Sequence, residues 1–418
     1  MQSKSTLMPM LIIGVLFFIF GFVTWLNGSL IPFLKIICDL NEFEALFVTF
    51  AFYIAYTVMA FPMALLLEKS GYKKGMAVGL GVMAVGSLLF IPAALSGEYL
   101  LFLLALFSLG TGLTILQTAS NPYIVLIGPI ESAATRISIM GLINKSAGVL
   151  APIVFTTLIL SDINFNQSVE LIDKNLLAQQ LIEPYIIMAL ILTALILLIK
   201  FSPLPELGFE SDAYDGVSIL SFPRVVLGAV ALFFYVGVEV IAGDTIGLYA
   251  QTLGVQNATS LTSYTMLFMV LGYIVGVLFI PKYLSQAKAL TYSAIVGIVL
   301  VLGVAFSSSS EDYISAYLWG WSGIMTLPNS VTFIALLGFA NALVWPTIWP
   351  LALNGLGKHT PKGSALLIMA IAGGALLPLA FGKIIQLSGN MQLSYLFGIV
   401  SYLFILLYAL RWHKKISW

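Results

Sequence analysis

Long apolar segments alternate with short polar ones along almost the whole chain. Segments 11–22, 99–116 and 185–199 contain no charged residue at all. An α-helix rises about 1.5 Å per residue, so about 20 apolar residues cross a bilayer core of about 30 Å. The pattern therefore predicts an all-α membrane protein with about twelve transmembrane helices. The predicted spans are residues 8–34, 43–67, 75–96, 99–127, 136–161, 181–201, 223–251, 259–281, 288–309, 329–354, 363–386 and 390–411.

The composition excludes a soluble protein. Of the 418 residues, 60% are hydrophobic and 9% are charged, whereas a soluble domain carries about 25% charged residues. The 18 basic residues balance the 18 acidic ones, so the net charge says nothing about partners. Because the chain is so apolar we expect a lipid bilayer around it, and because it has no basic patch we expect no nucleic-acid partner. The single cysteine, Cys38, rules out an internal disulfide and a cysteine-based metal cluster. We expect no cofactor and no enzymatic activity.

The loops differ in charge between the two sides of the predicted bundle. One side carries most of the lysines and arginines, and the loops of the other side offer only Lys35 and Lys174. Because basic loops stay on the cytoplasmic side, we expect both termini in the cytoplasm and the chain in the inner or plasma membrane. The basic set is Lys4, Lys69, Lys73, Lys74, Lys200, Arg224, Lys282, Lys288, Lys358, Lys362, Arg411, Lys414 and Lys415.

One long polar break divides the chain near its middle. Residues 202–222 contain four acidic residues and two prolines. We therefore predict an N-terminal six-helix half (1–201), a cytoplasmic linker (202–222) and a C-terminal six-helix half (223–418). Asn121-Pro122-Tyr123 in the fourth span and Trp345-Pro346-Thr347 in the tenth suggest that the halves repeat. Two six-helix repeats are typical of the major facilitator fold, in which substrate binds near the midplane between the halves.

A polar loop follows the second predicted span. It reads Ala64-Leu-Leu-Leu-Glu68-Lys69-Ser70-Gly71-Tyr72-Lys73-Lys74. It resembles the loop signature of major facilitator transporters, with alanine and glutamate where that signature has glycine and aspartate. We expect a tight turn at Gly71; an ordinary basic cytoplasmic loop is the alternative. The predicted gating residues are Glu68, Lys69, Gly71, Lys73 and Lys74.

Four further strings resemble the fucose permease and glucose/galactose symporter family within the major facilitator superfamily. They lie at residues 26–32, 116–123, 234–239 and, in pieces, 346–364. The run Gln117-Thr118-Ala119-Ser120-Asn121-Pro122 is the most specific of them. The resemblance implies import of a neutral sugar with a proton or, in some branches, with sodium, by a protein that works as a monomer.

This chain departs from the fucose branch of that family at three positions. Gly28 and Gln117 stand where the branch has the two carboxylates that carry its proton. Lys145 follows Asn144, where the branch has a small polar residue. The proton mechanism of fucose permease therefore cannot be transferred to this chain.

Ionisable residues within the predicted spans are candidates for function, because burying one in a bilayer costs at least about 2.5–3.5 kcal/mol. Lys145 and Glu239 lie near the middle of their spans, where they are either functional or form a structural ion pair. Asp244 lies nearer the outside on another face, and we expect it at the mouth of the pathway or as a cap. Arg136 and Lys383 lie near helix ends, and we expect their side chains to reach the membrane interface.

Neutral polar and aromatic side chains suit a sugar ligand. Gln117 and Asn121 are four residues apart, as are Tyr235 and Glu239, so each pair shares one helix face. Amides donate to and accept from hydroxyl groups, and an aromatic ring can cover the apolar face of a pyranose. The predicted substrate-binding residues are Gln117, Asn121, Asn144, Tyr235, Glu239, Asn341, Trp345 and Trp349.

Two aromatic groups allow a second interpretation. Asn341, Trp345 and Trp349 form a stripe along the tenth span, and packing against lipid is the alternative for its two tryptophans. For Phe52, Tyr53 and Tyr56 we expect a packing role, and a place in the substrate site is the alternative.

The coupling ion is less clearly marked than the sugar. Proton coupling needs a group that exchanges a proton, and Glu239 is the best remaining carboxylate. Sodium needs hard oxygen ligands, which Gln117, Asn121 and Asn27, next to a predicted helix break at Gly28, can supply. Loss of the two fucose-type carboxylates favours Na⁺ slightly. The cation-coupling candidates are Asn27, Gln117, Asn121, Glu239 and Lys145.

The sequence thus predicts a cation-coupled secondary active importer of a neutral hexose or related sugar. Its two halves would alternate access to a midplane site. An uncoupled sugar facilitator remains the main alternative. A nutrient sensor on a transporter scaffold is disfavoured by the short linker and the short tail, 411–418. A drug antiporter is disfavoured because the amide set suits hydroxyl-rich ligands.

Overall fold

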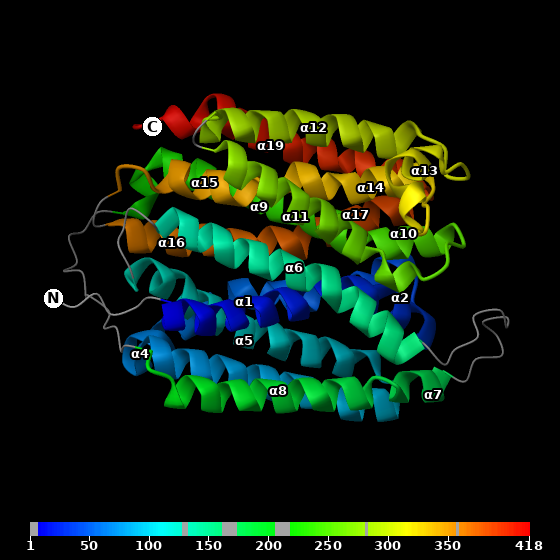
Figure 1. Cartoon of the computed structure of the whole chain (residues 1–418), viewed down its shortest axis with the longest axis horizontal. Coiled ribbons are helices and arrows are strands. Elements are labelled where there is room, and N and C mark those ends of the chain that lie inside the picture. Colours follow the sequence, from blue (N-terminus) through cyan, green and yellow to red (C-terminus); the bar gives the residue numbers. More distant parts are fainter. Residues whose placement is uncertain (1–6, 128–132, 161–173, 205–217, 281–282, 357–358) are drawn as a thin grey trace.

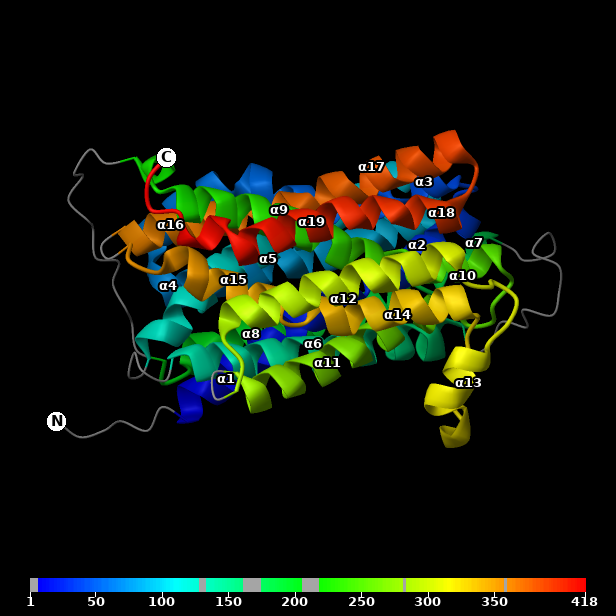
Figure 2. The same ribbon diagram turned by 90° about the horizontal axis from the view of Figure 1, so that it is seen from above.

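The computed structural model of the chain is a bundle of nearly parallel helices (Figures 1 and 2). It describes residues 7–127, 133–160, 174–204, 218–280, 283–356 and 359–418. Over these residues, 12 helical segments are long and apolar enough to cross a membrane, and no strand occurs. Many lipid-facing leucines and valines, such as Leu100 and Leu190, are exposed, as expected for helices solvated by hydrocarbon.

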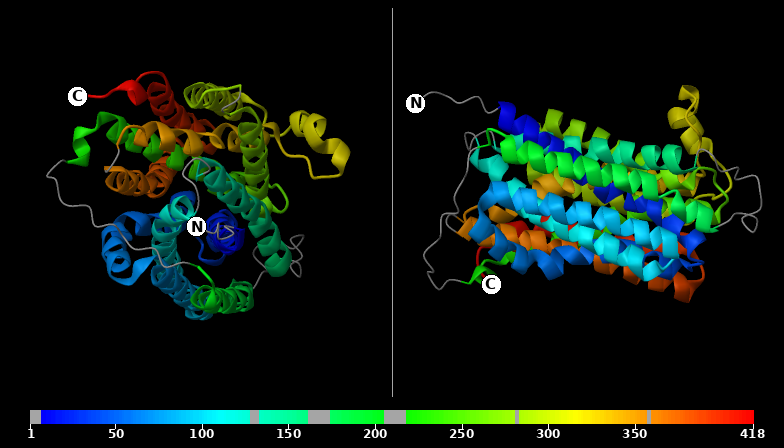
Figure 3. Two further views of the ribbon diagram at one scale, coloured as in Figure 1. Left: turned by 60° about the vertical axis from the view of Figure 1, so that its left-hand side comes forward. Right: turned by 90° about the horizontal axis from the view of Figure 1, so that it is seen from below.

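The helices fall into two sets along the chain. In the end-on view of Figure 3, the blue-to-cyan helices gather on one side and the yellow-to-red helices on the other. The first set consists of α1 (Leu7–Trp25), α2 (Asn27–Ile37), α3 (Glu42–Ala45), α4 (Phe47–Ser96), α5 (Tyr99–Leu126), α6 (Ala133–Leu160), α7 (Lys174–Gln179) and α8 (Ile182–Phe201).

The second set follows the linker. Its α-helices are α9 (Pro223–Asp244), α10 (Ile246–Thr252), α11 (Thr262–Phe279), α12 (Gln286–Phe306), α13 (Tyr313–Trp319), α14 (Asn329–Asn341), α15 (Val344–Leu353), α16 (Thr360–Met369), α17 (Gly373–Ser388), α18 (Met391–Ser394) and α19 (Gly398–Leu410). Short 3₁₀ turns are η3 (Ile219–Ser221), η4 (Ala258–Ser260), η5 (Gly320–Ser322), η7 (Ala370–Ala372), η8 (Tyr395–Phe397) and η9 (Trp412–Lys414).

The second and third predicted spans are joined at a turn within α4. Gly71 has φ 76° and ψ 171°, a backbone conformation that is essentially restricted to glycine. The turn predicted at Gly71 is therefore confirmed. Nearby, Lys73 Nζ donates to the backbone oxygen of Ser202 at 2.8 Å, which ties this turn to the start of the linker. The Glu68 side chain lies outside the described part of the chain.

Several spans contain a break, and three of these breaks lie at or near residues singled out in the sequence. α1 gives way to α2 at Leu26, two residues before the break predicted at Gly28. α9 gives way to α10 at Thr245, and α14 gives way to α15 after Asn341. The stripe predicted along residues 341–349 is therefore interrupted rather than continuous. Broken helices free backbone groups near the protein interior, where they must find other partners.

One end of the bundle is closed by contacts between the two sets. α1 begins and α19 ends at the opposite end (Figure 1), so we call the closed end the distal end. There, Ser29 Oγ donates to the backbone oxygen of Thr259 at 2.5 Å, and the hydroxyls of Thr156 and Thr259 lie 2.8 Å apart. Gln251 Nε2 donates to the backbone oxygen of Pro32 at 3.4 Å. These bonds join helices that are more than 100 residues apart in sequence.

Candidate functional site

A buried ion pair joins the two sets of helices. Lys145 Nζ on α6 donates to Glu239 Oε1 on α9 at 2.6 Å. The two side chains are only 11% and 8% exposed. The Lys145 ammonium also lies 4.4 Å from the centre of the Trp25 ring, close enough for a cation–π interaction. The ion pair that the sequence allows for these two residues therefore forms.

Glycines allow the Trp25 ring to sit over this pair. A Cβ added at Gly148 on α6 would lie 2.6 Å from Trp25 Cδ1, and one at Gly243 on α9 would lie 2.5 Å from Trp25 Cζ3. Both distances are shorter than real contacts allow. The indole is therefore held between α6 and α9 because neither helix has a side chain at these positions.

Aromatic residues continue the cluster on the other side of Glu239. Tyr235 lies one turn before Glu239 on α9, is fully buried and interacts with its carboxylate. Its ring centre is 6.3 Å from that of Trp345, which in turn is 5.5 Å from that of Trp349. Trp345 and Trp349 are only partly buried, and the Trp349 indole N–H has no hydrogen-bond partner among the described residues.

The predicted amide residues are distributed over several helices. Gln117 Nε2 donates to the Tyr56 hydroxyl at 2.9 Å, and Asn144 Nδ2 donates to the backbone oxygen of Phe17 at 3.2 Å. Asn341 is fully buried, and its Oδ1 accepts from the Tyr402 hydroxyl at 2.8 Å. Asn144 and Asn341 thus each form a hydrogen bond with a neighbouring helix. The Asn121 side chain lies outside the described part of the chain.

Asn27, at the start of α2, is 1% exposed. Its Nδ2 has no hydrogen-bond partner within the described residues. Burying an unpaired amide N–H costs free energy, so this position is suited to a ligand or a bound water.

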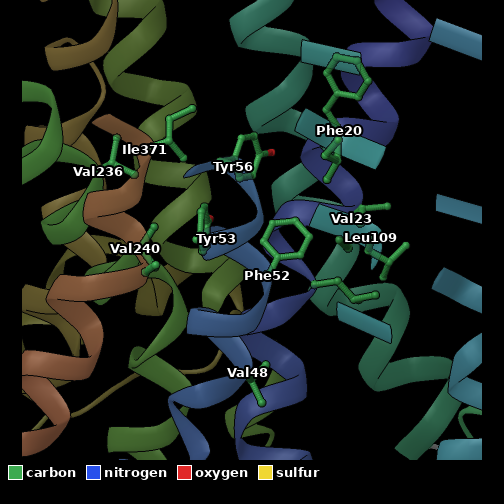
Figure 4. Close-up of a cluster of buried hydrophobic side chains, with 14 of the residues drawn as sticks. Phe20, Val23, Val48, Phe52, Tyr53, Tyr56, Leu109, Val236, Val240 and Ile371 are labelled. Carbon is green, nitrogen blue, oxygen red and sulfur yellow. The ribbon is translucent and has the colours of Figure 1, made fainter. Parts of the chain in front are cut away.

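Tyr56 packs as expected and also bonds Gln117, a predicted site residue. It lies with Phe52 and Tyr53 on α4, between residues of α1 and α5 on one side and Val236 and Ile371 on the other (Figure 4). The Tyr53 and Tyr56 rings are stacked with centres 6.2 Å apart. Because the Tyr56 hydroxyl accepts from Gln117 and orients its amide, we group Tyr56 with the predicted polar residues of the candidate site. A hydroxyl on an otherwise apolar helix face was the signal available in the sequence.

Asp244 and Arg136 are both buried. Asp244, expected at the mouth of the pathway or as a cap, lies at the closed distal end; it is 0% exposed, and its Oδ2 accepts from Thr49 Oγ1 at 3.0 Å. The position predicted for Arg136 is wrong. Arg136 is 7% exposed and does not reach the interface, since its Nε donates to the backbone oxygen of Ile124 at 2.9 Å. The last four carbonyls of a helix lack partners within it, and Ile124 carries one of these in α5.

An apolar groove of about 310 Å³ lies apart from these polar residues. Val226, Val230 and Phe233 of α9 and Leu366 and Met369 of α16 are among the residues that line it. The Met369 sulfur, a weak acceptor, is the one side-chain atom of this lining that could bond a sugar hydroxyl, so the polar residues around Glu239 remain the better candidate site.

The chain matches known transporters over nearly its full length. The family model of the Major Facilitator Superfamily matches residues 13–377. The chain is 34% identical to a glucose/galactose transporter of Brucella abortus, covering 96% of this chain and 93% of that protein. It is 28% identical to the L-fucose-proton symporter of Escherichia coli, covering 98% and 94%.

Solved structures agree with these sequence matches. The Escherichia coli fucose:proton symporter has a TM-score of 0.73 at 25% identity, covering 99% of this chain and 100% of that one. A D-xylose-proton symporter has a TM-score of 0.69 at 14% identity, which is a likeness of fold alone.

Proposed function

Because the chain belongs to the Major Facilitator Superfamily, and within it to the family of the glucose/galactose transporters and fucose–proton symporters, we propose that it is a cation-coupled secondary active importer of a neutral hexose or related sugar. Like its relatives, it is a transporter and not an enzyme. The boundaries of its two halves, at residues 201 and 223, are part of this proposal.

The Lys145–Glu239 pair is the observation that carries the proposal. It is the buried charge pair that links α6 of the first set to α9 of the second. A carboxylate with one oxygen on an ammonium group can still accept a hydrogen bond from a sugar hydroxyl through its other lone pairs. Tyr235 and Trp345 provide aromatic surface next to that carboxylate, and an aromatic face suits the C–H face of a pyranose.

The pair also provides a link between binding and movement. While Lys145 and Glu239 stay bonded, α6 and α9 are held together near the middle of the bundle. A sugar that takes over hydrogen bonds from either charge changes the strength of this link. Binding energy is thereby coupled to the rocking of one half against the other, which is how such transporters alternate access.

The orientation follows from the charge of the loops. With both termini in the cytoplasm, as the basic loops predict, the distal end faces the outside. The described conformation, closed at the distal end by the Ser29–Thr259 and Gln251–Pro32 bonds, then has its outside end closed.

A proton is the coupling ion that the relatives favour. The relatives whose names give an ion are proton symporters, and no relative supports the slight preference for Na⁺ drawn from the sequence. Glu239, paired with Lys145, remains the candidate that links an ion to the sugar site. The Na⁺ alternative would use oxygens of Asn27, Gln117 and Asn121.

The uptake of radiolabelled sugars into proteoliposomes tests this proposal. Each vesicle sample carries an inwardly directed proton gradient, an inwardly directed Na⁺ gradient, or neither. The sugars tested are glucose, galactose, fucose and N-acetylglucosamine. We expect one of these sugars to accumulate under the pH gradient. Mere equilibration under both gradients would identify a facilitator, and no entry of any sugar would overturn the proposed substrate class.

A further inference from the structure

We propose that Asp244 is a proton-binding site of the distal gate, so that closing the distal end takes up one proton. This inference goes beyond the proposed sugar site, because it concerns a different carboxylate, placed between the halves at the closed end. It stands on the burial, the contacts and the position of Asp244.

Asp244 is buried without a counter-charge. It is 0% exposed; Oδ2 accepts from Thr49 Oγ1 at 3.0 Å, and Oδ1 has no hydrogen-bond partner among the described residues. An isolated ionised carboxylate in such surroundings is very costly, and a buried group of this kind becomes neutral instead. A protonated carboxyl group removes the charge and still accepts the Thr49 hydrogen bond.

No positive charge in the described surroundings can replace that proton. The charged group that acts on Asp244 is Glu239 on α9 itself, and the neutral Tyr53 phenol on α4 is the other titratable group that interacts with it. No basic group of the described residues is among those that act on Asp244, and the Lys145 ammonium is bonded to Glu239. A second negative charge on the same helix makes an ionised Asp244 still less favourable.

The helices around Asp244 show why this burial depends on the conformation. Asp244 ends α9 at the break before α10, whereas Thr49 belongs to α4 of the other set. A Cβ at Gly28, beside the break between α1 and α2, would lie 3.0 Å from the backbone oxygen of Gly243 and 2.1 Å from Thr262 Oγ1. The two helix breaks are therefore packed directly against each other.

Separation of the halves at the distal end would break the Thr49–Asp244 hydrogen bond and the packing of Gly28 against Gly243. Opening removes Thr49 from the carboxylate and admits water to the α9–α10 break. In water a carboxyl group ionises readily, whereas in the closed interface it is held neutral. Low pH should therefore favour the closed distal end, and high pH should favour the open one.

Spin-label distance measurements on the full chain in nanodiscs test this coupling. Labels at Leu95→Cys and Gln256→Cys, in a Cys38→Ser background, report the distance between the two sets at the distal end. The pH is varied from about 5 to about 9, the range over which buried carboxyl groups titrate. In the pH range where Asp244 is ionised in the open state, the ratio of the closed to the open population should fall about tenfold for each unit that the pH rises.

Asp244→Asn is the decisive variant, since an amide has the size of the carboxyl group and no proton to exchange. We expect the closed population of this variant to be independent of pH. Glu98→Gln, which removes an exposed acid at the same end, should leave the pH response of the parent protein intact.

Other outcomes overturn the inference. A pH response that persists in Asp244→Asn would assign the proton to another group. Closure at high pH on addition of Na⁺, lost in Asp244→Asn, would make Asp244 a sodium ligand instead. Sugar uptake measured in parallel separates this test from the proposed function, because a protein that carries sugar but shows no pH-dependent closure refutes the gate alone.

Discussion

The indole ring of Trp25 covers the ammonium group of Lys145 at 4.4 Å. The same ammonium is bonded to Glu239, so one charge is held by an aromatic ring of α1 and a carboxylate of α9. Three helices, from both sets, therefore meet at a single nitrogen atom. Any movement of one set against the other near the middle of the bundle must change this arrangement.

Removal of the lysine charge alone should be strongly destabilising. In Lys145→Met, Glu239 would remain buried without its partner, which we expect to cost about 3–5 kcal/mol of unfolding free energy. The double variant Lys145→Met with Glu239→Gln leaves no unpaired charge and should recover most of that loss. Thermal unfolding of the purified variants in detergent measures both effects. If the double variant is no more stable than the single one, the pair does not explain the stability.

Glu239→Gln should separate sugar movement from accumulation. The amide keeps hydrogen-bonding capacity but cannot carry a proton or hold Lys145 by charge. We expect exchange of sugar across the membrane to continue, while accumulation driven by a gradient falls by roughly tenfold or more, equivalent to about 1.4 kcal/mol. Counterflow and gradient-driven uptake in proteoliposomes distinguish the two. Wild-type accumulation in this variant would exclude Glu239 from coupling.

The hydrogen bond between Gln117 and Tyr56 should be visible as an energetic coupling. Tyr56→Phe removes the acceptor that orients the Gln117 amide, and Gln117→Leu removes the amide itself. Each should weaken sugar binding, and the double variant should be less weakened than the sum, with a coupling of about 0.5–1.5 kcal/mol. Titration of sugar binding to the four proteins gives the cycle. Strict additivity would show that the two residues act independently.

The turn in α4 should depend on glycine for its backbone rather than for space. No atom lies within 4 Å of a Cβ added at Gly71, yet its φ is +76°. Gly71→Ala should therefore cost about 1–3 kcal/mol of local strain and slow transport if this turn moves during the cycle. Gly97→Ala is the control, because Gly97 also has a positive φ and open space but caps α4 at the distal end. Equal effects on transport from both variants would leave no gating role for the Gly71 turn.

Cys38, just beyond α2, should react slowly with thiol reagents. Burial, with a smaller contribution from the neighbouring Asp39 and Glu98 carboxylates, raises the pKa of this thiol to about 11. Only the thiolate reacts, so the rate of maleimide labelling should rise about tenfold per pH unit through the alkaline range. Mass spectrometry of labelled protein follows the reaction. A rate equal to that of a free cysteine at neutral pH would contradict the burial of the thiol.

Much of the fold could be predicted from the sequence because its determinants are local. The length of each apolar run decides whether a helix can cross the bilayer, and all twelve predicted spans correspond to helical segments. The turn at Gly71 was predictable because glycine beside polar residues between two apolar runs has few other uses. The family was predictable because strings such as 116–123 are contiguous in sequence.

The positions of the helix breaks were less accessible. The break in the first span lies at Leu26 and not at Gly28, because Gly28 serves instead as the contact with Thr262 and Gly243. A glycine that permits close packing and a glycine that interrupts a helix look the same in one sequence. Only the neighbouring helix distinguishes them.

The sequence by itself determined the membrane environment, the number of spans, the family and the list of polar residues within the spans. The tertiary structure decided which of those residues meet. Lys145 and Glu239 are 94 positions apart and become partners, whereas Asp244, five residues beyond Glu239, is buried against Thr49 of the other set. The physical reason is that periodicity assigns a residue to a helix face, but the neighbour of that face depends on how the helices pack and on which end of the bundle is closed.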